Sequence, residues 1–214
     1  MMRKAGLLTL FLAFSSALVP ISLIRADEIV PGQPAPAFSA KDTKGNMHNL
    51  ADYKGKVVIL EWLNHDCPFV KKHYNSGNMQ KLQAFAAEKS IVWLSIISSA
   101  PGKQGYCTPE QADALAAEKK AVPAAILLDP EGEVGKLYDA KTTPHMYIID
   151  TAGILVYNGA IDDIRSSNVE DIAKAKNYVR AALDEMLAGK QVTDKTSQPY
   201  GCTVKYKQGG TGAK

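Results

Sequence analysis

Residues 57–74 read VVILEWLNHDCPFVKKHY and join an apolar run to the start of a helix. The run VVILEWL (57–63) is rich in β-branched residues and is typical of a strand that is covered on both faces. Helical periodicity begins at Pro68, and proline is favoured at the first position of a helix. The stretch therefore predicts that Cys67 lies at the junction of a central strand and a helix.

Strands and helices alternate along the rest of the chain. Strands are predicted at 57–63, 91–97 and 124–129; hairpins at 37–50 and 145–159; and helices at 68–87 with a bend at 75–78, from 109 with Thr108 as its cap, at 134–140 and at 168–188. This order predicts an α/β fold, a three-layer α/β/α sandwich with an N-terminal β-hairpin and a mixed, mostly parallel central sheet. The chain from residue 191 is expected to be an irregular tail that ends in disorder.

The first 26 residues have the pattern of an export signal. A basic start is followed by an apolar stretch from Ala5 to Ile24, and Ala26 offers a small residue for cleavage. The expected organisation is a signal peptide at 1–26, one α/β domain at 27–190 and a tail at 191–214 that carries Cys202. The expected location is outside the cytosol, the periplasm in a Gram-negative bacterium. The apolar stretch also suits an uncleaved membrane anchor that leaves the domain facing outward.

The charge of the chain gives no indication of nucleic-acid binding. Its formal net charge is +3, from 25 basic and 22 acidic residues. Cleavage after Ala26 removes three basic residues and no acidic one, which leaves a formal charge of zero. A basic stripe, the usual feature of a nucleic-acid binder, is not apparent. No pattern implies a nucleotide, a flavin or a haem, and the sequence does not predict an oligomeric state.

Cys67 has the setting of a reactive thiol. As the residue before Pro68 it is expected to cap the helix, where unpaired N–H groups and the helix dipole favour the thiolate. Lys71 adds positive charge and Asp66 opposes it. The alternative interpretation is an inert buried cysteine.

Four stretches resemble members of the thioredoxin superfamily. They are 31–62 (PGQPAPAFSAKDTKGNMHNLADYKGKVVILEW), 64–74 (NHDCPFVKKHY), 127–163 (LLDPEGEVGKLYDAKTTPHMYIIDTAGILVYNGAIDD) and 199–206 (PYGCTVKY). The similarity is strongest to exported, peroxiredoxin-like redoxins of the alkyl hydroperoxide reductase and thiol-specific antioxidant type, and it covers about residues 30–206. It implies a thioredoxin-like fold and a thiol-dependent oxidoreductase.

The resemblance also implies roles for individual residues. Pro144 falls where these folds keep a cis-proline that faces the reactive cysteine, and Thr143 before it is expected to hydrogen-bond an extended substrate. Glu61 matches the buried acid beneath the cysteine. A carboxyl group in so apolar a strand is expected to have a raised pKa and to transfer protons. The alternatives for Glu61 are a polar gap or a lysine partner.

The active-site turn departs from the patterns of its relatives. Val70 replaces the second cysteine of thioredoxin, so a disulfide within the turn is excluded. Asn64 stands where peroxiredoxins have a threonine, and no arginine is apparent near Pro144. Asn64 and Pro68 are still expected to line the substrate site. The substrate is therefore left open between a peroxide and a protein or small-molecule disulfide, with a thiol or a redox protein as electron donor.

A distant cysteine is expected to resolve the intermediate formed at Cys67. The odd number of cysteines leaves at least one thiol unpaired within the chain. The resemblance favours Cys202, in its Gly-Cys tail, as the resolving residue. Cys107, in the loop before a predicted helix, is the alternative.

Two further interpretations belong to other functional classes. Cys67, His65 and His145, with His73 and Met146 nearby, form a soft ligand set that suits copper, and they suggest a copper-binding or metal-delivery protein. A redox-inactive scaffold that only binds partners is the other alternative.

Overall fold

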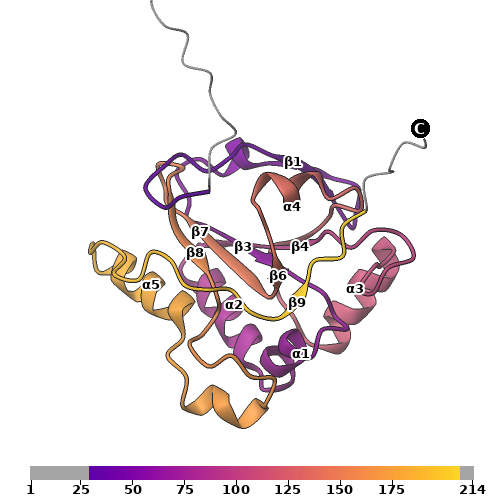
Figure 1. Ribbon diagram of the computed structural model, residues 1–214. Helices are drawn as coiled ribbons and strands as arrows, with labels where there is room; N and C mark the ends of the chain where they lie inside the picture. The colour runs from indigo at the N-terminus through magenta and orange to yellow at the C-terminus, as the bar shows by residue number, and fades with distance from the viewer. Residues whose placement is uncertain (1–28, 208–214) are drawn as a thin grey trace, which may run out of the picture.

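A computed structural model describes residues 29–207 of the chain (Figure 1). Its main sheet has seven strands in the order β2-β1-β5-β4-β3-β7-β8, and a second sheet pairs β6 with β9. The strands are β1 (Ser39–Asp42), β2 (Met47–Asn49), β3 (Val58–Trp62), β4 (Val92–Ile97), β5 (Ala125–Leu128), β6 (Thr142–Thr143), β7 (His145–Ile149), β8 (Leu155–Gly159) and β9 (Cys202–Thr203).

The apolar run that follows Gly55 becomes a central strand, as predicted. All five residues of β3 are buried. β3 pairs in parallel with β4, where Glu61 lies opposite Ser95, and antiparallel with β7. Among the strand pairs of the main sheet, only β3–β4 and β4–β5 are parallel, and both hairpins join the sheet antiparallel. The sheet is therefore mixed, with fewer parallel pairs than the sequence pattern indicates.

The helices cover both faces of the sheet. They are α1 (Pro68–Asn75), α2 (Asn78–Glu88), α3 (Pro109–Glu118), α4 (Glu133–Leu137) and α5 (Tyr178–Leu187), with short 3₁₀ helices at Leu50–Tyr53 and Val169–Ala173. In Figure 1, α4 lies above the sheet, and α1, α2, α3 and α5 lie below it. One apolar cluster joins β3 and β4 to the lower helices, and the other packs beneath α4 around Trp62 and Tyr138. The three-layer α/β/α sandwich is confirmed.

Local sequence signals place two helix boundaries correctly. The chain bends between α1 and α2 at Gly77, whose φ of 73° suits glycine. At the start of α3 the Thr108 side chain accepts a hydrogen bond from Gln111 N, and the Gln111 side chain accepts one from Thr108 N. This is the predicted capping box.

The single helix expected at 168–188 is wrong. The segment holds a 3₁₀ helix and then α5, which begins at Tyr178. Asn177 pairs with Asp162 in an isolated bridge, and Tyr178 N donates a hydrogen bond to Ile161 O at 3.0 Å. These hydrogen bonds to residues 161–162, which follow β8, interrupt the predicted helix. The Asn177 side chain then caps α5 by accepting a hydrogen bond from Arg180 N.

The tail expected to be irregular from residue 191 is also partly wrong. Ser197 accepts a hydrogen bond from Ala160 N at 2.8 Å, and β9 pairs with β6. The segment from Tyr200 to Tyr206 lies along the β6 end of the domain (yellow in Figure 1). The predicted signal peptide at 1–26 and the last residues of the tail, 208–214, lie outside the described residues.

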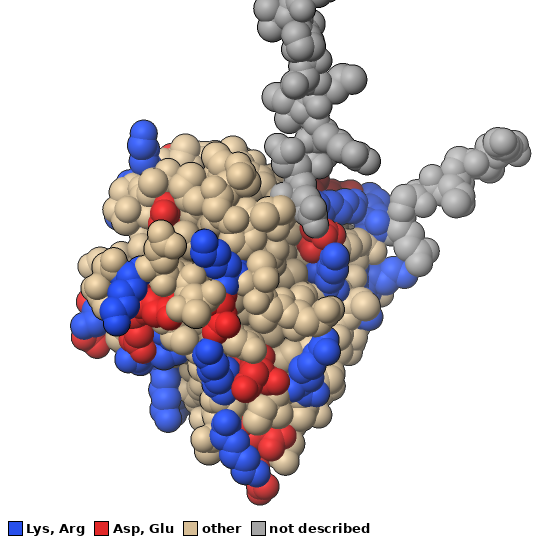
Figure 2. Space-filling model, turned by 60° about the vertical axis from the view of Figure 1, so that its left-hand side comes forward, with Lys and Arg blue, Asp and Glu red and all other residues tan. Residues whose placement is uncertain are grey.

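Two features of the described surface concern location and partners. In residues 29–207 no helix combines the length and the apolar character that crossing a membrane requires. Figure 2 shows one face on which basic and acidic side chains are interspersed rather than gathered by sign.

Candidate active site

Cys67 is the N-cap of α1, in the short connection that follows the carboxyl end of β3 at Trp62. Its backbone is extended, with φ −69° and ψ 125°, and Pro68 occupies the first position of the helix. The Cys67 side chain has 0% of its surface exposed, and Sγ donates a hydrogen bond to the carbonyl oxygen of Thr143 at 3.0 Å. The thiol thus faces the loop that enters β7.

Cys202 is the cysteine that the fold brings to Cys67. In the antiparallel β6–β9 pair Cys202 lies opposite Thr143, the residue whose carbonyl oxygen binds Cys67, and the two thiols are near enough to shift each other's pKa. All three cysteines are free thiols. Cys107 is buried elsewhere, and its Sγ contacts Gly105 O at 3.7 Å.

The surroundings of Cys67 favour its thiolate. Burial acts in the opposite direction, because the charged form loses water. Hydrogen bonds from the Cys202 thiol and the Thr143 side chain outweigh burial and lower the pKa of the Cys67 thiol. The backbone N–H groups of Cys202 and Val70 contribute in the same direction, the latter from the first turn of α1.

The Cys202 thiol has the opposite tendency. Burial and its hydrogen bond to Cys67 raise the pKa of Cys202 above the ordinary value for a thiol. At neutral pH Cys67 is therefore the readier nucleophile of the two, and Cys202 keeps its proton.

Thr143 and Pro144 form the other wall of the site. The peptide bond between them is cis, as the resemblance implies, and both residues are buried. Thr143 contacts both cysteines, since its carbonyl accepts from Cys67 and its hydroxyl reaches the carbonyl of Cys202 at 3.5 Å.

Glu61 lies on β3 with 0% of its surface exposed. Its Oε2 accepts hydrogen bonds from Trp93 Nε1 and Ser95 Oγ, each at 2.8 Å, and its Oε1 accepts one from the Tyr74 hydroxyl at 2.9 Å. Burial raises the pKa of the Glu61 carboxyl, and these donors only partly offset it. Neither a lysine partner nor a polar gap accounts for Glu61, because Trp, Ser and Tyr donors satisfy it.

A buried polar cluster on α1, which the sequence did not indicate, holds the tail just before Cys202. Lys72 Nζ lies 3.2 Å from Asp162 Oδ2 and donates to Ile164 O at 3.0 Å. The Tyr200 hydroxyl donates to Asp162 Oδ1 and lies 3.5 Å from both Lys72 Nζ and His73 Nε2. All four of these side chains are buried, so α1 binds the tail through an interior ion pair.

A second tyrosine holds the tail beyond Cys202. The Tyr206 hydroxyl donates to Ala140 O at 2.7 Å. Its ring covers Gly132 and Gly135, where an added Cβ would come within 2.5 Å of ring atoms. Small residues at these two positions of the α4 turn therefore make room for the tail.

Several predicted site residues have other partners. Asn64 accepts from Asp66 N at 2.9 Å, lies 3.5 Å from Gln104 O and is 1% exposed, contacts that do not support its predicted substrate role. Pro68 is exposed beside the site. Lys71 is exposed too, and hydrogen bonds rather than Lys71 lower the pKa of Cys67.

The predicted copper ligands do not assemble. Among residues 29–207 no three His, Cys, Asp or Glu side chains form a group that could hold a metal ion. His145 Nε2 is bonded to Asn158 Oδ1 at 2.9 Å, and His73 Nδ1 is bonded to Asn78 Nδ2 at 2.9 Å. In the described residues Cys67, His65 and His145 are therefore not gathered into one group of ligands.

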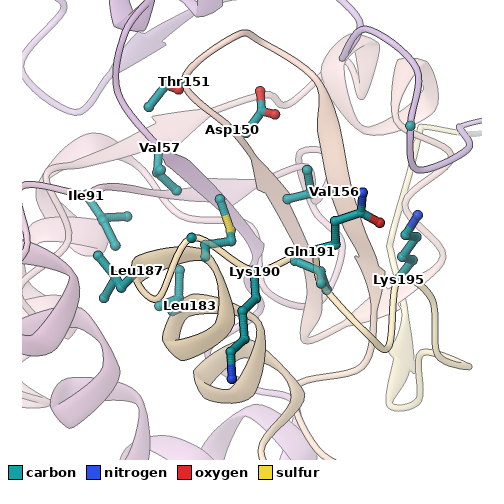
Figure 3. A pocket seen from close by; sticks show the side chains of 14 residues that line it. Val57, Ile91, Asp150, Thr151, Val156, Leu183, Leu187, Lys190, Gln191 and Lys195 are labelled. Carbon is teal, nitrogen blue, oxygen red and sulfur yellow. The ribbon is translucent and has the colours of Figure 1, made fainter.

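A cavity of about 650 Å³ lies away from these cysteines. Figure 3 shows it between α5 and the β7–β8 turn, with Val57 and Ile91 on one side and Leu183 and Leu187 below. Val57 precedes β3, whereas Cys67 follows it, so the cavity and the thiols are at opposite ends of that strand. The cavity is therefore not part of the candidate active site.

Comparisons with known proteins agree with this geometry. The AhpC/TSA family matches residues 31–158. The thiol-disulfide oxidoreductase ResA of Geobacillus kaustophilus is 24% identical over 159 residues, which cover 71% of this chain and 82% of that protein. The thioredoxin-like protein YneN of Bacillus subtilis is 31% identical over 127 residues, 59% of this chain and 69% of that protein.

Solved structures match over a larger part of the chain. An uncharacterized conserved protein from Geobacillus kaustophilus aligns with a TM-score of 0.72 and 30% identity, over 86% of this chain and 95% of that one. A hypothetical protein from Sinorhizobium meliloti aligns with a TM-score of 0.71 and 26% identity, over 86% of this chain and 98% of that one. The chain therefore belongs to the AhpC/TSA family and is a thiol-dependent oxidoreductase with a thioredoxin-like fold.

Proposed function

We propose that this chain is an exported thiol–disulfide oxidoreductase that cycles between a Cys67–Cys202 dithiol and disulfide. The observation that carries the proposal is the strand pair that places Cys202 opposite Thr143, whose carbonyl oxygen accepts the hydrogen bond of Cys67. The mutual influence of the two thiols lowers the pKa of Cys67 and raises the pKa of Cys202. A nucleophile and a protonated resolving thiol held in contact are what the two steps of disulfide exchange require.

The exchange proceeds through one mixed disulfide. The Cys67 thiolate attacks one sulfur of the substrate disulfide, forms a new S–S bond and releases the other substrate sulfur as a thiolate. Cys202 then loses its proton and attacks Cys67 Sγ, which forms the Cys67–Cys202 bond and releases the second substrate sulfur. The substrate gains two electrons and the protein dithiol loses them, and an external dithiol or redox protein returns the enzyme to its reduced form.

A disulfide suits this site better than a peroxide. The amide of Asn64 accepts a hydrogen bond from Asp66 N and faces Gln104 O in the loop after β4, and neither contact involves the Cys67 thiol. Of the two arginines in the described part of the chain, Arg180 pairs with Asp184 at 2.9 Å and Arg165 is exposed. Neither donates to Cys67, so the developing charge on a leaving oxygen has no arginine to stabilise it.

Glu61 is proposed to take part in proton transfer through Tyr74, the residue of α1 that binds its carboxyl group. Burial raises the pKa of the Glu61 carboxyl, which makes it a better proton acceptor than an exposed glutamate. Glu61→Gln is expected to change the pH dependence of the second step, the attack of Cys202 on the mixed disulfide. The pH dependence of the first step, the attack of Cys67 on the substrate, is expected to stay the same. The two rates are separated by quenched-flow thiol trapping, and equal pH profiles in both proteins would exclude this role.

Export is proposed because the chain has a basic start, an apolar stretch and Ala26 at a suitable place for cleavage. Disulfides persist outside the cytosol, so an exported protein would meet disulfide substrates there. Fractionation of cells that express the full chain, with mass spectrometry of the mature N-terminus, tests it. A protein that starts at Asp27 is expected outside the cytosol. A cytosolic protein that retains Met1 would contradict export.

The decisive experiment compares wild type with Cys67→Ser, Cys202→Ser and Cys107→Ser in two assays. The first follows reduction of insulin disulfides with dithiothreitol as donor, and the second follows consumption of hydrogen peroxide. Cys67→Ser is expected to abolish disulfide reduction, Cys202→Ser to trap a mixed disulfide on Cys67, and Cys107→Ser to act like wild type.

Three outcomes would contradict the proposal. Disulfide reduction that survives Cys67→Ser excludes Cys67 as the nucleophile. A bridge that links Cys67 to Cys107, found in non-reduced peptides, excludes Cys202 as the resolving residue. Peroxide consumption that depends on Cys67, with no disulfide reduction, would assign the chain to peroxide chemistry instead.

A further inference from the structure

The thiol that has to meet a substrate has no exposed surface. Cys67 is 0% exposed, and the residue beside its sulfur is Cys202 of the tail. The backbone of β9 occupies the edge of β6, the edge at which an extended substrate would pair by adding a strand. We expected Thr143 to hydrogen-bond an extended substrate. In the structure the tail of the protein itself occupies that position.

The tail is held unequally on the two sides of Cys202. On the near side, the Tyr200 hydroxyl is bonded to Asp162, whose other oxygen pairs with Lys72, and the Tyr200 ring packs edge-on against Phe69 at 5.7 Å. Tyr200 is 6% exposed. A buried ring whose hydroxyl joins an interior ion pair opens only with the surrounding structure.

On the far side the tail residues are more exposed than Tyr200, although they also have partners, which include an exposed ion pair between Lys207 and Glu131. Val204 N donates to Lys141 O at 3.0 Å, Ala100 N donates to Lys205 O at 2.9 Å, and the Tyr206 hydroxyl donates to Ala140 O. Thr203 is exposed, and its neighbours on this side are only partly buried. Short edge pairs of this kind open locally at a lower free energy than the domain unfolds.

Gly201 joins the two sides. Its φ is +133°, a region that L side chains rarely adopt, and an added Cβ would lie 2.1 Å from Thr143 O. Glycine thus lets the backbone of the tail approach the β6 edge closely and turn there.

We propose that residues 201–206 form a swinging arm, anchored at Tyr200 by the Lys72–Asp162 pair, and that Cys67 meets its substrate only when this arm leaves the Thr142–Thr143 edge. Tyr200 is a positioning residue, because it acts on the reaction through Cys202. Tyr206 holds the arm closed. The proposal rests on the proposed function in one respect, that Cys202 returns to Cys67 to resolve the mixed disulfide.

The proposed reaction requires two movements of residues 201–206. The arm must leave for a substrate strand to reach the β6 edge, and the anchor must keep Cys202 close enough to return. An anchored thiol has a high effective concentration at Cys67, which a released tail loses. The arm therefore governs the first step of disulfide exchange, and the anchor governs the second.

Alkylation of the fully reduced protein tests the closing role of Tyr206. Iodoacetamide is added at neutral pH, and the label on Cys67 is followed by peptide mass spectrometry. Tyr206→Ala is expected to speed labelling of Cys67 by about fivefold or more, the effect of losing one hydrogen bond and its ring contact, and Tyr206→Phe by less. Tyr53→Ala is the matched control, since Tyr53 is also partly buried and bonded through its hydroxyl, at His48.

The Tyr53→Ala control distinguishes release of the arm from a general destabilisation of the fold. Equal labelling rates in wild type, Tyr206→Ala and Tyr53→Ala would overturn the arm. A Tyr53→Ala rate as high as that of Tyr206→Ala would also overturn it, because general destabilisation would then explain both.

The anchor is tested by the rate at which the internal disulfide forms. The reduced protein is treated with oxidised glutathione, and the Cys67–Cys202 peptide is quantified against time. Tyr200→Ala is expected to slow formation of the bridge at least about tenfold while glutathione still adds to Cys67, and Tyr200→Phe, which keeps the ring, is expected to lie between Tyr200→Ala and wild type. Thermal unfolding of each variant identifies any that fails to fold.

The two proposals fail differently. If wild type forms the Cys67–Cys202 bridge but no arm variant changes either rate, the arm is wrong and the proposed function stands. If wild type forms no such bridge, resolution by Cys202 is wrong, whereas faster labelling in Tyr206→Ala would still support a segment that covers Cys67. A bridge rate in Tyr200→Ala equal to wild type would overturn the anchor.

Discussion

Cys202 is the antiparallel partner of Thr143, and the carbonyl of that same threonine accepts the hydrogen bond of Cys67 at 3.0 Å. One residue therefore positions both sulfurs of the proposed redox pair. Val70 occupies the position of a second cysteine in the active-site turn. Cys202 takes the place of that cysteine, and a strand pair rather than a helix turn brings it to Cys67.

Replacing Cys202 tests the electrostatic side of this arrangement. Cys202→Ala removes the thiol that lowers the pKa of Cys67 and keeps the backbone of β9. The pKa of Cys67 is expected to rise, because its thiolate loses a neighbour that stabilises the charge. The pH dependence of the rate of iodoacetamide labelling measures it. Cys107→Ala is the control, and identical midpoints in all three proteins would contradict the assignment.

Glu61 is expected to make folding stability depend on pH. Burial raises the pKa of its carboxyl above the ordinary value of 4.5, so the folded protein binds this proton more tightly than the unfolded chain. The stability contributed by the proton is fully present below the unfolded pKa and is lost as the pH rises from there through the folded pKa. The slope is at most about 1.4 kcal/mol per pH unit for one proton.

Glu61→Gln should remove this component of the slope. Urea unfolding between pH 4 and 8 measures the free energy of unfolding of both proteins. The stability of wild type is expected to fall more steeply with rising pH than that of Glu61→Gln. Parallel curves would show that the carboxyl group is ionised in the folded protein throughout this range.

The interior pair of Lys72 and Asp162 is expected to be costly to break. Lys72→Met leaves Asp162 buried with the Tyr200 hydroxyl but without its cation. The free energy of unfolding is expected to fall by about 3–5 kcal/mol, whereas Lys72→Met with Asp162→Leu should cost less than the two single changes added together. Denaturant titration of the four proteins measures the coupling. Lys174→Met, which loses an exposed pair to Asp171 at 3.9 Å, should change little.

The parts of the fold that could be predicted are those in which a local pattern decides the structure. The apolar run of β3 can only be a covered strand, and Thr108 with Gln111 specifies a helix start without any distant partner. The junction of strand, Cys67 and Pro68 follows from the same local rules. The resemblance then supplied the cis bond at Pro144 and the choice of Cys202 over Cys107.

The parts that could not be predicted depend on distant partners. β6 and β9 have two residues each, too few for a periodic pattern. Lys72 sits beside Lys71 in the sequence, and only the packing of α1 against Asp162 and Tyr200 distinguishes the buried lysine from the exposed one. The suggested grouping of copper ligands has the same weakness, because spacing along the chain does not reveal that Asn158 binds His145 and that Asn78 binds His73.

Gly201 gives the sharpest test of how closely the tail approaches the site. Gly201→Ala adds a Cβ that would lie 2.1 Å from the carbonyl oxygen of Thr143, a backbone atom that cannot move aside without disturbing β6. The β6–β9 pair is therefore expected to open. Formation of the Cys67–Cys202 bridge with oxidised glutathione should slow by about tenfold or more, because the two thiols lose their contact.

The matched control for this change is Gly45→Ala. Gly45 also has a positive φ, +82°, but an added Cβ there meets nothing within 4 Å. Both variants carry backbone strain, whereas only Gly201→Ala carries the clash. Bridge formation in Gly45→Ala should match wild type, and circular dichroism should report a folded domain in both variants. If Gly201→Ala forms the bridge as fast as Gly45→Ala, then the tail reaches Cys67 by some route other than the β6 edge.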